Sequence, residues 1–505
     1  MKNRLLFIIL FVLSFLTLNA QQVNSLYFLE NAPTRHTINP AFQPVSKIYI
    51  ALPVIGNTSF AFGINGIKMS DLIFTNEKGE TITALHPDVV GQLWQKMPKS
   101  LHIETDLPLN IISFGRRIKD NGYLTIGVSE HVIFGTGLPK SIFSPLLGQS
   151  IENLNLTTLN ASATMYSDIA IGYSHRINER WTVGGKLKFF IGNAHISGTF
   201  SDFEFNSNLD IATLKGLGNI RQAGLTDIRI ITGEKELLSN EENVYDGYPD
   251  NGQDNGTVES KQVLDSIKQY LLPQGIGGGV DLGFTYKPIN QLQLAFSITD
   301  LGLIHWHKGS IGSISVDTTF TGVGDFNMAD YVIDGQFMKE QFKEDVKADM
   351  EKYAEALHIG DIQDQAFNQM ITANLNIGID ANFWKNRIGI GMYSHTQFCN
   401  ILSRIRVTEE ITLGAAFRPA NWFNLALTYS FINSHWSNVG AAVSLAPYDG
   451  IMITVAADYV PLLYADYGIN ENTVIPLPYK TNHLNCSLGL AIVIGTNPKK
   501  NKDAK

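Results

Sequence analysis

Apolar and polar residues alternate over long stretches of this chain. Over the 13 residues from 371 to 383, apolar side chains occupy every odd position and polar residues or Gly every even one. Alternation with a period of two indicates a β-strand whose two faces meet different surroundings. A strand in an ordinary soluble domain has about five or six residues, so this one is unusually long. We therefore expect strands of membrane-spanning length.

The pattern recurs and predicts strands at fourteen places. Short groups of Asn, Asp, Gly and Pro predict tight turns near residues 120, 179, 289, 386, 420 and 449. Longer connections cover 66–103, 135–158, 201–275, 307–368 and 462–481. The predicted strands are 58–65, 104–118, 122–134, 159–177, 180–200, 276–287, 291–306, 369–384, 387–399, 404–418, 422–432, 437–447, 451–461 and 482–495.

Tight turns at one end and long loops at the other favour an all-β fold, a transmembrane antiparallel β-barrel of about 14 strands. Hydrocarbon cannot hydrogen-bond a backbone, so only helices and closed barrels cross it. Residues 47–54 also resemble a strand, but a fifteenth would break the even count. We assign them, with the residues before them, to the lumen or the barrel mouth. A soluble β-sandwich is the alternative, and the strand lengths argue against it.

The first residues have the pattern of a secretory signal peptide. Lys2 and Arg4 precede a mostly apolar run over 5–18, with cleavage expected after Ala20. An uncleaved anchor is the alternative, but the run is too short to span a bilayer. The expected organisation is a signal peptide at 1–20, a plug-like segment at 21–57, a barrel at 58–495 with long outer loops at 201–275 and 307–368, and a charged tail at 496–505.

Composition fits a barrel in the outer membrane of a bacterial cell. The 505 residues are 17% charged, below the roughly 25% of typical soluble proteins. A net charge of −9 disfavours nucleic acid as a partner. The predicted barrel makes outer-membrane lipid the expected partner. Five of the six tryptophans fall near predicted strand ends, where aromatic residues mark membrane interfaces. These interface aromatics are Trp181, Trp306, Trp384, Trp422 and Trp436.

Polar residues on the other strand face are expected to line the lumen. A barrel this wide is not filled by its own side chains, so it holds water, a plug or a ligand. Simple solvation of the lumen is the alternative to ligand contact. The lumen-facing candidates are Lys186, Lys188, Asp281, Asn376, Asp380, Asn382 and Arg418.

Chemistry-bearing motifs are sparse. Asp246, Asp250 and Asp254 lie in a Gly-rich loop that offers oxygen ligands to Ca²⁺, but the loop lacks the terminal Glu of a calcium-binding loop. An acidic outer loop is the alternative, and we expect no metal and no cofactor. No catalytic motif is present, so we do not expect an enzyme. Residues 336–357 have the pattern of an amphipathic helix in an outer loop.

Two motifs near the N-terminus carry a family resemblance. NSLYFL at 24–29 is followed by Asn39, Pro40, Ala41 and Phe42. In a barrel of about 14 strands, this resembles the fatty-acid transporter (FadL/TodX-type) superfamily and the PorV-like barrels of type IX secretion. It is more similar still to a family of uncharacterised Bacteroidota outer-membrane proteins. The resemblance implies that 39–42 belong to a lumenal plug, whereas an ordinary Asn-Pro turn is the alternative. Such barrels end in an aromatic residue, and this sequence differs from them in its charged tail.

We therefore expect an outer-membrane channel or transporter for hydrophobic or amphipathic small molecules. This expectation rests on the resemblance of the fold. The alternative is a structural or secretion-associated barrel that docks protein partners through its outer loops, as PorV-like proteins do.

Overall fold

The computed structural model describes most of the chain between residues 23 and 495. The ranges outside it are 1–22, 65–66, 68–70, 72, 76–80, 84–89, 145–152, 209–210, 225–272, 322–331, 334–335, 338–357, 360–362, 400–405, 421, 433–434, 449, 461–462, 471–472, 480–482 and 496–505. The predicted signal peptide, the charged tail and the Asp246, Asp250 and Asp254 loop lie outside the described residues.

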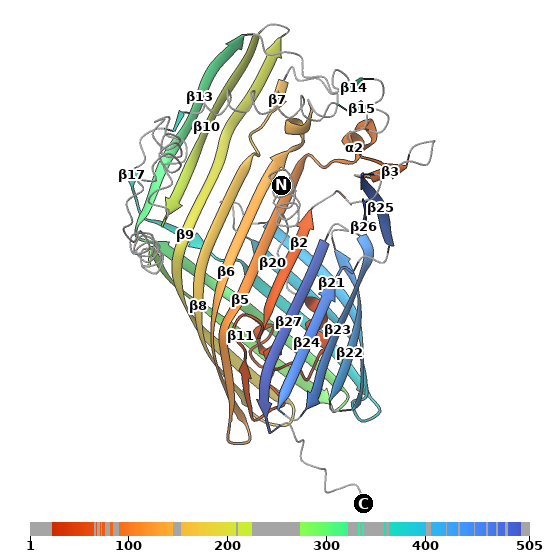
Figure 1. The fold of residues 1–505 in the computed structure, drawn as a ribbon. Coiled ribbons are helices and arrows are strands. Elements are labelled where there is room, and N and C mark those ends of the chain that lie inside the picture. Colours follow the sequence, from red (N-terminus) through yellow and green to blue (C-terminus); the bar gives the residue numbers. More distant parts are fainter. Residues whose placement is uncertain are drawn as a thin grey trace, which may run out of the picture.

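Within the described residues, fourteen antiparallel strand positions close into a barrel (Figure 1). Each of the fourteen predicted ranges coincides with one of them, which confirms the predicted fold. Two short strands share the first position. The wall consists of β1 (Ile48–Ala51) with β2 (Thr58–Ile64), β5 (Ser100–Ile118), β6 (Gly122–Pro139), β8 (Asn160–Arg176), β9 (Trp181–Asn208), β11 (Gly275–Ile289), β12 (Leu292–Trp306), β19 (Ala373–Phe383), β20 (Ile388–Cys399), β21 (Arg406–Ala420), β22 (Phe423–Ile432), β23 (His435–Tyr448), β24 (Ile451–Asp458) and β27 (His483–Ile494).

The first strand position corrects the assignment of residues 47–54. Ile48–Ala51 pairs with both β27 and β5, and so does β2, so β1 and β2 are two parts of one strand position. The interruption between them stays attached to the neighbouring strands, because Leu52 N donates to Leu490 O and Val54 N donates to Asn110 O. An interrupted strand adds no fifteenth position. The even count therefore holds although 48–51 lies in the wall.

Tight connections lie at one end of the barrel, at the bottom of Figure 1. They join β5 to β6, β8 to β9, β11 to β12, β19 to β20, β21 to β22 and β23 to β24. The start of β1 lies at the same end, where it pairs with the last residues of β27. We call this the turn end and the opposite one the loop end.

The loop end contains strands that the sequence analysis assigned to loops 201–275 and 307–368. The strand β9 continues to Asn208, and β10 (Ile211–Ala223) and β13 (Gly309–Thr321) extend the sheet beyond the barrel rim (Figure 1). Gly216 and Gly218 weaken the apolar alternation of β10, which explains why its pattern was missed. Those two ranges are therefore only partly loops.

Shorter elements complete the loop end. Of the predicted helix over 336–357, Gln336–Phe337 is instead a strand that pairs with Val332–Ile333, and 338–357 lies outside the described residues. No helix in the described part of the chain is long and apolar enough to cross a membrane. The remaining elements are β3 (Ile73–Thr75), β4 (Thr81–Thr83), α2 (Val90–Lys96), η4 (Lys140–Phe143), β7 (Asn153–Asn155), β14 (Val332–Ile333), β15 (Gln336–Phe337), β16 (His358–Ile359), β17 (Gln363–Asp364), β18 (Phe367–Met370), β25 (Leu463–Asn470) and β26 (Thr473–Tyr479).

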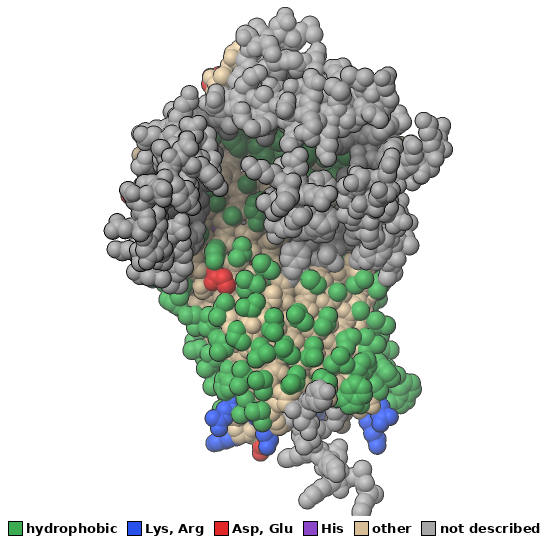
Figure 2. Space-filling view, in the orientation of Figure 1, with side chains coloured by type: hydrophobic (Ala, Val, Ile, Leu, Met, Phe, Trp, Pro, Cys, Tyr) green, Lys and Arg blue, Asp and Glu red, His purple; other side chains and the backbone are tan. Residues whose placement is uncertain are grey.

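The outer surface of the wall is apolar. Figure 2 shows hydrophobic side chains across the visible face of the lower barrel, with Lys and Arg gathered at the rim of the turn end. Leu187 is 71% exposed and its neighbour on the same face, Phe189, is 46% exposed, while Lys186 and Lys188 point inward. Exposed apolar groups in this arrangement are typical of a barrel surface that faces lipid.

Candidate functional site

The N-terminal segment lies inside the barrel and occupies its lumen. We call residues 23–46 the plug segment. It contains two short 3₁₀ turns, η1 (Asn24–Phe28) and η2 (Pro33–Thr37), and η1 packs against β20, β21, β22, β23 and β24. Tyr27, Leu29 and Ile38 are almost completely buried. The segment therefore forms a core with the inner wall of the barrel.

Asp458 at the end of β24 holds the start of the plug segment. Its carboxylate accepts hydrogen bonds from the backbone N–H groups of Asn24, at 2.5 Å, and Ser25, at 3.3 Å. The first N–H groups of a helical turn have no partner within the turn, and a carboxylate is the strongest acceptor for them. Asp458 itself is 1% exposed, so this attachment is shielded from water.

Tyr27 joins the plug segment to the neighbouring strands β19 and β20. Its hydroxyl donates to Asp380 Oδ2 at 2.5 Å, and its ring stacks on Tyr393 with 4.5 Å between the ring centroids. Arg35 Nε donates to Tyr27 O at 2.6 Å, and its guanidinium lies 3.9 Å from both Asp380 Oδ2 and the Phe42 ring centroid. Burial, together with the negative charge of Asp380, raises the pKa of Tyr27 well above its usual value, so the hydroxyl remains a donor.

Glu30 fastens the plug segment near the turn end. It accepts hydrogen bonds from the side-chain amides of Asn386, at 2.7 Å, and Asn382, at 3.4 Å, and pairs with Arg418 at 3.6 Å. Burial by itself raises the pKa of Glu30, but the positive charges of Arg418 and Arg35 outweigh it and lower that pKa below its usual value. Glu30 is therefore ionised at neutral pH.

The Asn-Pro-Ala element rests directly on the wall. Asn39 Oδ1 accepts a hydrogen bond from Ala41 N at 2.9 Å, and Asn39 Nδ2 donates to Phe296 O at 3.0 Å. Gly184 and Gly283 face this element. A Cβ on Gly184 would lie 2.3 Å from Pro40 O, and one on Gly283 would lie 2.2 Å from Asn39 Oδ1. Only glycine at these two positions allows so close an approach.

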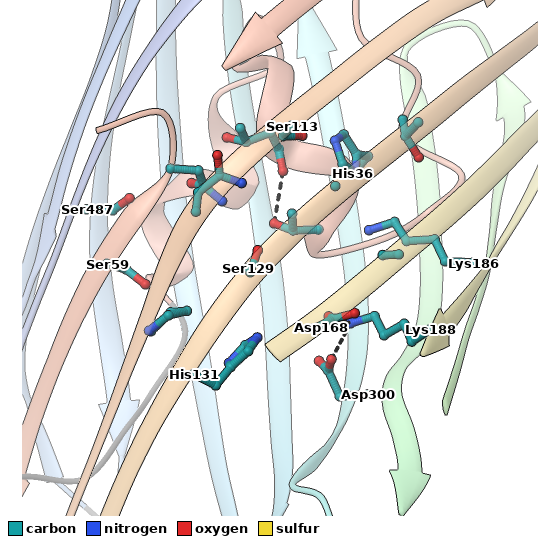
Figure 3. A pocket seen from close by; sticks show the side chains of 18 of the residues that line it. His36, Ser59, Ser113, Ser129, His131, Asp168, Lys186, Lys188, Asp300 and Ser487 are labelled. Atoms are coloured by element: carbon teal, nitrogen blue, oxygen red, sulfur yellow. Dashed lines mark hydrogen bonds and ion pairs between the residues drawn. The ribbon is translucent and has the colours of Figure 1, made fainter. Parts of the chain in front are cut away.

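A cavity of about 200 Å³ lies on the loop side of the plug segment (Figure 3). Its lining is rich in hydroxyl, amide and charged groups, and His36 and Thr37 of the plug segment contribute to it. Lys188 Nζ lies 3.3 Å from Asp168 Oδ2 and 3.4 Å from Asp281 Oδ2, and it also pairs with Asp300. Lys186 Nζ lies 3.7 Å from Asp281 Oδ2. We call it the loop-side cavity.

A bulge in β12 brings Asp300 into this network. The pairing of β12 with β11 shifts by one residue between Ile298 and Leu301. Asp300 adopts φ of 61° there, and its backbone N–H donates to Asp281 Oδ1 at 2.8 Å. An extra residue in a strand exchanges the two faces beyond it. Ser297 and Thr299 therefore point inward before the bulge, and Ile304 and Trp306 point inward after it.

An apolar cluster lies next to the loop-side cavity, towards the loop end. His131 stacks on Tyr166, with 4.7 Å between ring centroids, and Tyr166 meets the edge of Phe190 at 5.6 Å. Its buried members are Ile133, Tyr166, Phe190, Ala223, Ile304, Trp306, Phe367 and Ile371. The lumen thus presents a polar layer followed by an apolar one.

A second cavity, of about 810 Å³, lies on the turn side of the plug segment. Its lining includes Phe42 and Trp384, and its charged members are mostly basic. They are Glu30, Arg35, Arg176, Glu179, Arg180, Lys287 and Lys385. The plug segment therefore separates two cavities of different character.

The structure places all seven lumen-facing candidates inside the barrel. Lys186, Lys188 and Asp281 form the network described above, and Asp380, Asn382 and Arg418 hold Tyr27 or Glu30. Asn376 Nδ2 donates to Ile38 O at 3.1 Å. Asp458 and Asp300 were not among the residues predicted from the sequence to face the lumen. Asp458 lies on the inward face of β24, so the alternation of that strand was the signal that could have placed it in the lumen.

The interface aromatics divide into three groups. Trp181, Trp384 and Trp422 are exposed beside tight turns. Trp436 lies in β23, at a position whose side chain is outside the described structure. The assignment of Trp306 to the membrane interface is wrong, because this side chain is completely buried and donates to Gln369 Oε1 at 3.0 Å. The bulge at Asp300 turned it inward.

Within the described residues, no group of three or more His, Cys, Asp or Glu side chains is arranged to hold a metal ion.

Comparison with protein families places the chain. A family model described as "Family of unknown function (DUF5723)" matches residues 40–458. The chain belongs to this family. The match starts within the Asn-Pro-Ala element and ends at Asp458, so it spans most of the barrel. No curated protein matches the chain.

Several solved structures are similar in arrangement. A FadL homologue of Pseudomonas aeruginosa shares 10% identity over 95% of this chain and 99% of its own, with a TM-score of 0.40. The Pseudomonas putida toluene transporter TodX shares 10% identity over 91% and 94%, with a TM-score of 0.36. The monoaromatic hydrocarbon channel CymD shares 10% over 92% and 93%, with a TM-score of 0.39.

Proposed function

We propose that this DUF5723 protein is a plugged channel of a bacterial outer membrane for small amphipathic molecules. The observation that carries the proposal is the position of the plug segment, which lies between two lumenal cavities in a closed barrel with an apolar outer belt. A barrel with a purely structural role does not need a cavity on each side of such a segment.

The two layers of the loop-side lumen support an amphipathic cargo. The cavity lining offers hydroxyl, amide and charged groups to a polar head, and the adjoining cluster around Phe190 and Trp306 offers an apolar surface to a tail. Binding sites for small molecules combine apolar walls with a few well-placed polar groups in this way. Passage then requires the plug segment to loosen.

Location in an outer membrane is part of the proposal. Both ends of the wall, at β1 and β27, lie at the turn end together with the tight connections. In bacterial outer-membrane barrels the short turns are periplasmic and the long loops are extracellular. The turn-side cavity is therefore the periplasmic one in this proposal.

Ion conductance in planar bilayers tests the channel. We expect the purified full chain to show brief openings, and the Asp458→Asn and Tyr27→Phe variants to be open for a larger fraction of the time because each loses one attachment of the plug segment. Hexanol, as an uncharged amphiphile, is expected to reduce the open current by occupying the lumen. Heat-modifiable migration on a gel verifies that each variant remains a folded barrel.

A folded barrel that never conducts, with or without these substitutions, would overturn the proposal. Docking of protein partners through the outer loops is the other function expected from the sequence. The loops that it requires lie largely outside the described residues, so the conductance experiment is the sharper test.

A further inference from the structure

The loop-side cavity has a surplus of negative charge. Asp106, Asp168 and Asp300 line it, and Asp281 joins their network. Lys186 and Lys188 are the two ammonium groups in the same network. At neutral pH, four carboxylates against two ammonium groups leave two negative charges unbalanced. His131 Nδ1 lies 3.8 Å from Asp106 Oδ1, so a protonated His131 would still leave one negative charge.

The hydrogen-bonding groups of the lining show an independent imbalance. Asp168 Oδ1, Asp106 Oδ1 and Asn110 Oδ1 are buried acceptor atoms without a donor. Two histidine rings also line the cavity, and the Nδ1 atoms of His36 and His131 are likewise buried without a hydrogen-bond partner. Each Nδ1 accepts or donates according to the tautomer of its ring. No ammonium, amide N–H or hydroxyl group of the described lining is buried without a partner.

These unpartnered acceptors are built into the wall. Asp168 and Asn110 are each 6% exposed and lie on inward positions of long strands, Asn110 beside a register shift in the pairing of β5 with β6. A buried acceptor that has no donor loses its hydration without compensation, which costs about 1–3 kcal/mol. A molecule that brings N–H donors and positive charge would satisfy both deficits of the cavity together.

We propose that the loop-side cavity binds the positively charged head of a small organic cation, an ammonium or guanidinium group. The inference rests on the proposed function and gives the chemical class of the cargo's head. A cavity of about 150 Å³ in another protein holds one benzene molecule, so about 200 Å³ fits a head and a few carbon atoms. The apolar cluster next to Tyr166 then receives the rest of the tail.

Figure 3 shows the side chains that surround the cavity. His131, Asp168, Lys188 and Asp300 come from four strands, β6, β8, β9 and β12, and His36 of the plug segment lies across the cavity from them. Because Lys188 already pairs with three carboxylates, it has little positive charge left to repel a cation. Occupancy of this cavity also brings the cargo into contact with the plug segment through Thr34, His36 and Thr37.

Calorimetric titration of the full chain in detergent tests the proposal with three probes that share one tail. The probes are hexylammonium, hexanol and hexanoate. We expect hexylammonium to bind at least about tenfold more tightly than hexanol, a difference of about 1.4 kcal/mol, and hexanoate to bind more weakly than both. Equal binding of hexylammonium and hexanol, tighter binding of hexanoate, or no saturable binding of hexylammonium would overturn the proposal.

Two substitutions locate the binding. Asp168→Asn and, separately, Asp106→Asn keep the shape of the side chain and remove one negative charge, so each is expected to weaken hexylammonium about tenfold and to leave hexanol unchanged. Asp317→Asn is the matched control, because Asp317 is 78% exposed and pairs with exposed Lys215 in the extension above the barrel. If Asp317→Asn weakens hexylammonium as much as the lumenal variants do, the proposal is wrong.

The remaining outcomes separate this inference from the proposed function. Asp106 is more exposed than Asp168, at 28% against 8% for the side chains, so Asp106→Asn serves if Asp168→Asn does not give a heat-modifiable barrel. Competition by sodium chloride at the same concentration as hexylammonium would indicate a site for any cation and would overturn the assignment. Conductance without a preference for hexylammonium overturns this inference alone, whereas absence of conductance overturns the channel.

Discussion

Gly184 of β9 lies directly opposite Gly283 of β11, and this pair of inward-facing glycines supports the Asn-Pro-Ala element of the plug segment. Pro40 O and Asn39 Oδ1 approach the two Cα positions so closely that neither strand has room for a side chain. From the sequence, the lumen of so wide a barrel was expected to hold water, a plug or a ligand. In the structure the chain's own N-terminal segment fills that volume.

Gly184→Ala is expected to displace the plug segment. The new Cβ would meet backbone atoms of Pro40 and Ala41 at 2.3–2.6 Å, and backbone cannot move aside as a flexible side chain does. Overpacking of this kind costs about 1–3 kcal/mol. We expect faster proteolysis of residues 23–46 in the folded barrel, measured by mass spectrometry of the released peptides.

Gly185→Ala is the matched control for that substitution. Gly185 is the next residue on the same strand, and the nearest atom to its Cβ would be Asp281 O at 3.5 Å, an ordinary contact. The proteolysis rate of this variant is expected to equal that of the natural chain. Equal rates for all three proteins would show that the plug segment does not depend on the glycine pair.

Asp458→Asn is expected to release the start of the plug segment. The substitution keeps one acceptor oxygen but removes the charge that strengthens two backbone hydrogen bonds, from Asn24 and Ser25. Loss of a helix N-terminal cap costs about 0.5–2 kcal/mol. Hydrogen exchange of η1 should therefore accelerate by about two- to thirtyfold, whereas Asp120→Asn in an exposed turn should leave it unchanged. Unchanged exchange of η1 in Asp458→Asn would contradict the attachment.

Much of the barrel was predictable because its main signal is local. A strand that faces lipid on one side and a polar lumen on the other must alternate, and residues 371–383 and β19 carry that alternation without interruption. The tight turns were predictable for the same reason, since each is a short group of turn-forming residues. Lumen-facing Lys188 and Asp281 followed directly from the phase of their strands.

The missed features depend on contacts between distant segments. A bulge such as Asp300 leaves no mark in composition, and it reverses the faces of everything beyond it, including Trp306. The interruption at Leu52 is bridged by hydrogen bonds to strands near both ends of the chain. The partners of Asn39 lie about 250 residues away, so no local pattern shows that Gly283 is its support.

The stability of the plug segment is expected to depend on pH through His36. Burial, and then the positive charge of Lys186, lower the pKa of His36 well below its usual value, so His36 is neutral in the folded protein. In the unfolded chain the imidazole takes up a proton below about pH 6.5. The unfolded state thus binds more protons there, and stability is complete above that pH and declines below it by about 1.4 kcal/mol per pH unit.

His36→Gln isolates that contribution, because glutamine does not titrate and still offers hydrogen-bonding groups to Tyr49. The free energy of unfolding of the plug segment is measured in urea from the hydrogen exchange of η2. Between about pH 6.5 and pH 5 it should fall less steeply with decreasing pH in the variant than in the natural chain. The natural chain and His36→Gln should show the same pH dependence above that window. Parallel curves throughout would mean that His36 is accessible to protons in the folded state.

Trp306→Ala tests the consequence of the bulge at Asp300. Trp306 is completely buried, packs on His195 with 5.5 Å between ring centroids, and donates to Gln369. Replacing a buried Trp by Ala leaves a cavity and costs about 3–5 kcal/mol. Trp384→Ala is the control, because Trp384 is 74% exposed beside a tight turn. The temperature at which the barrel loses its heat-modifiable migration should fall clearly for Trp306→Ala and little for Trp384→Ala. If Trp306 faced lipid, as the uninterrupted alternation predicts, the two losses would be similar.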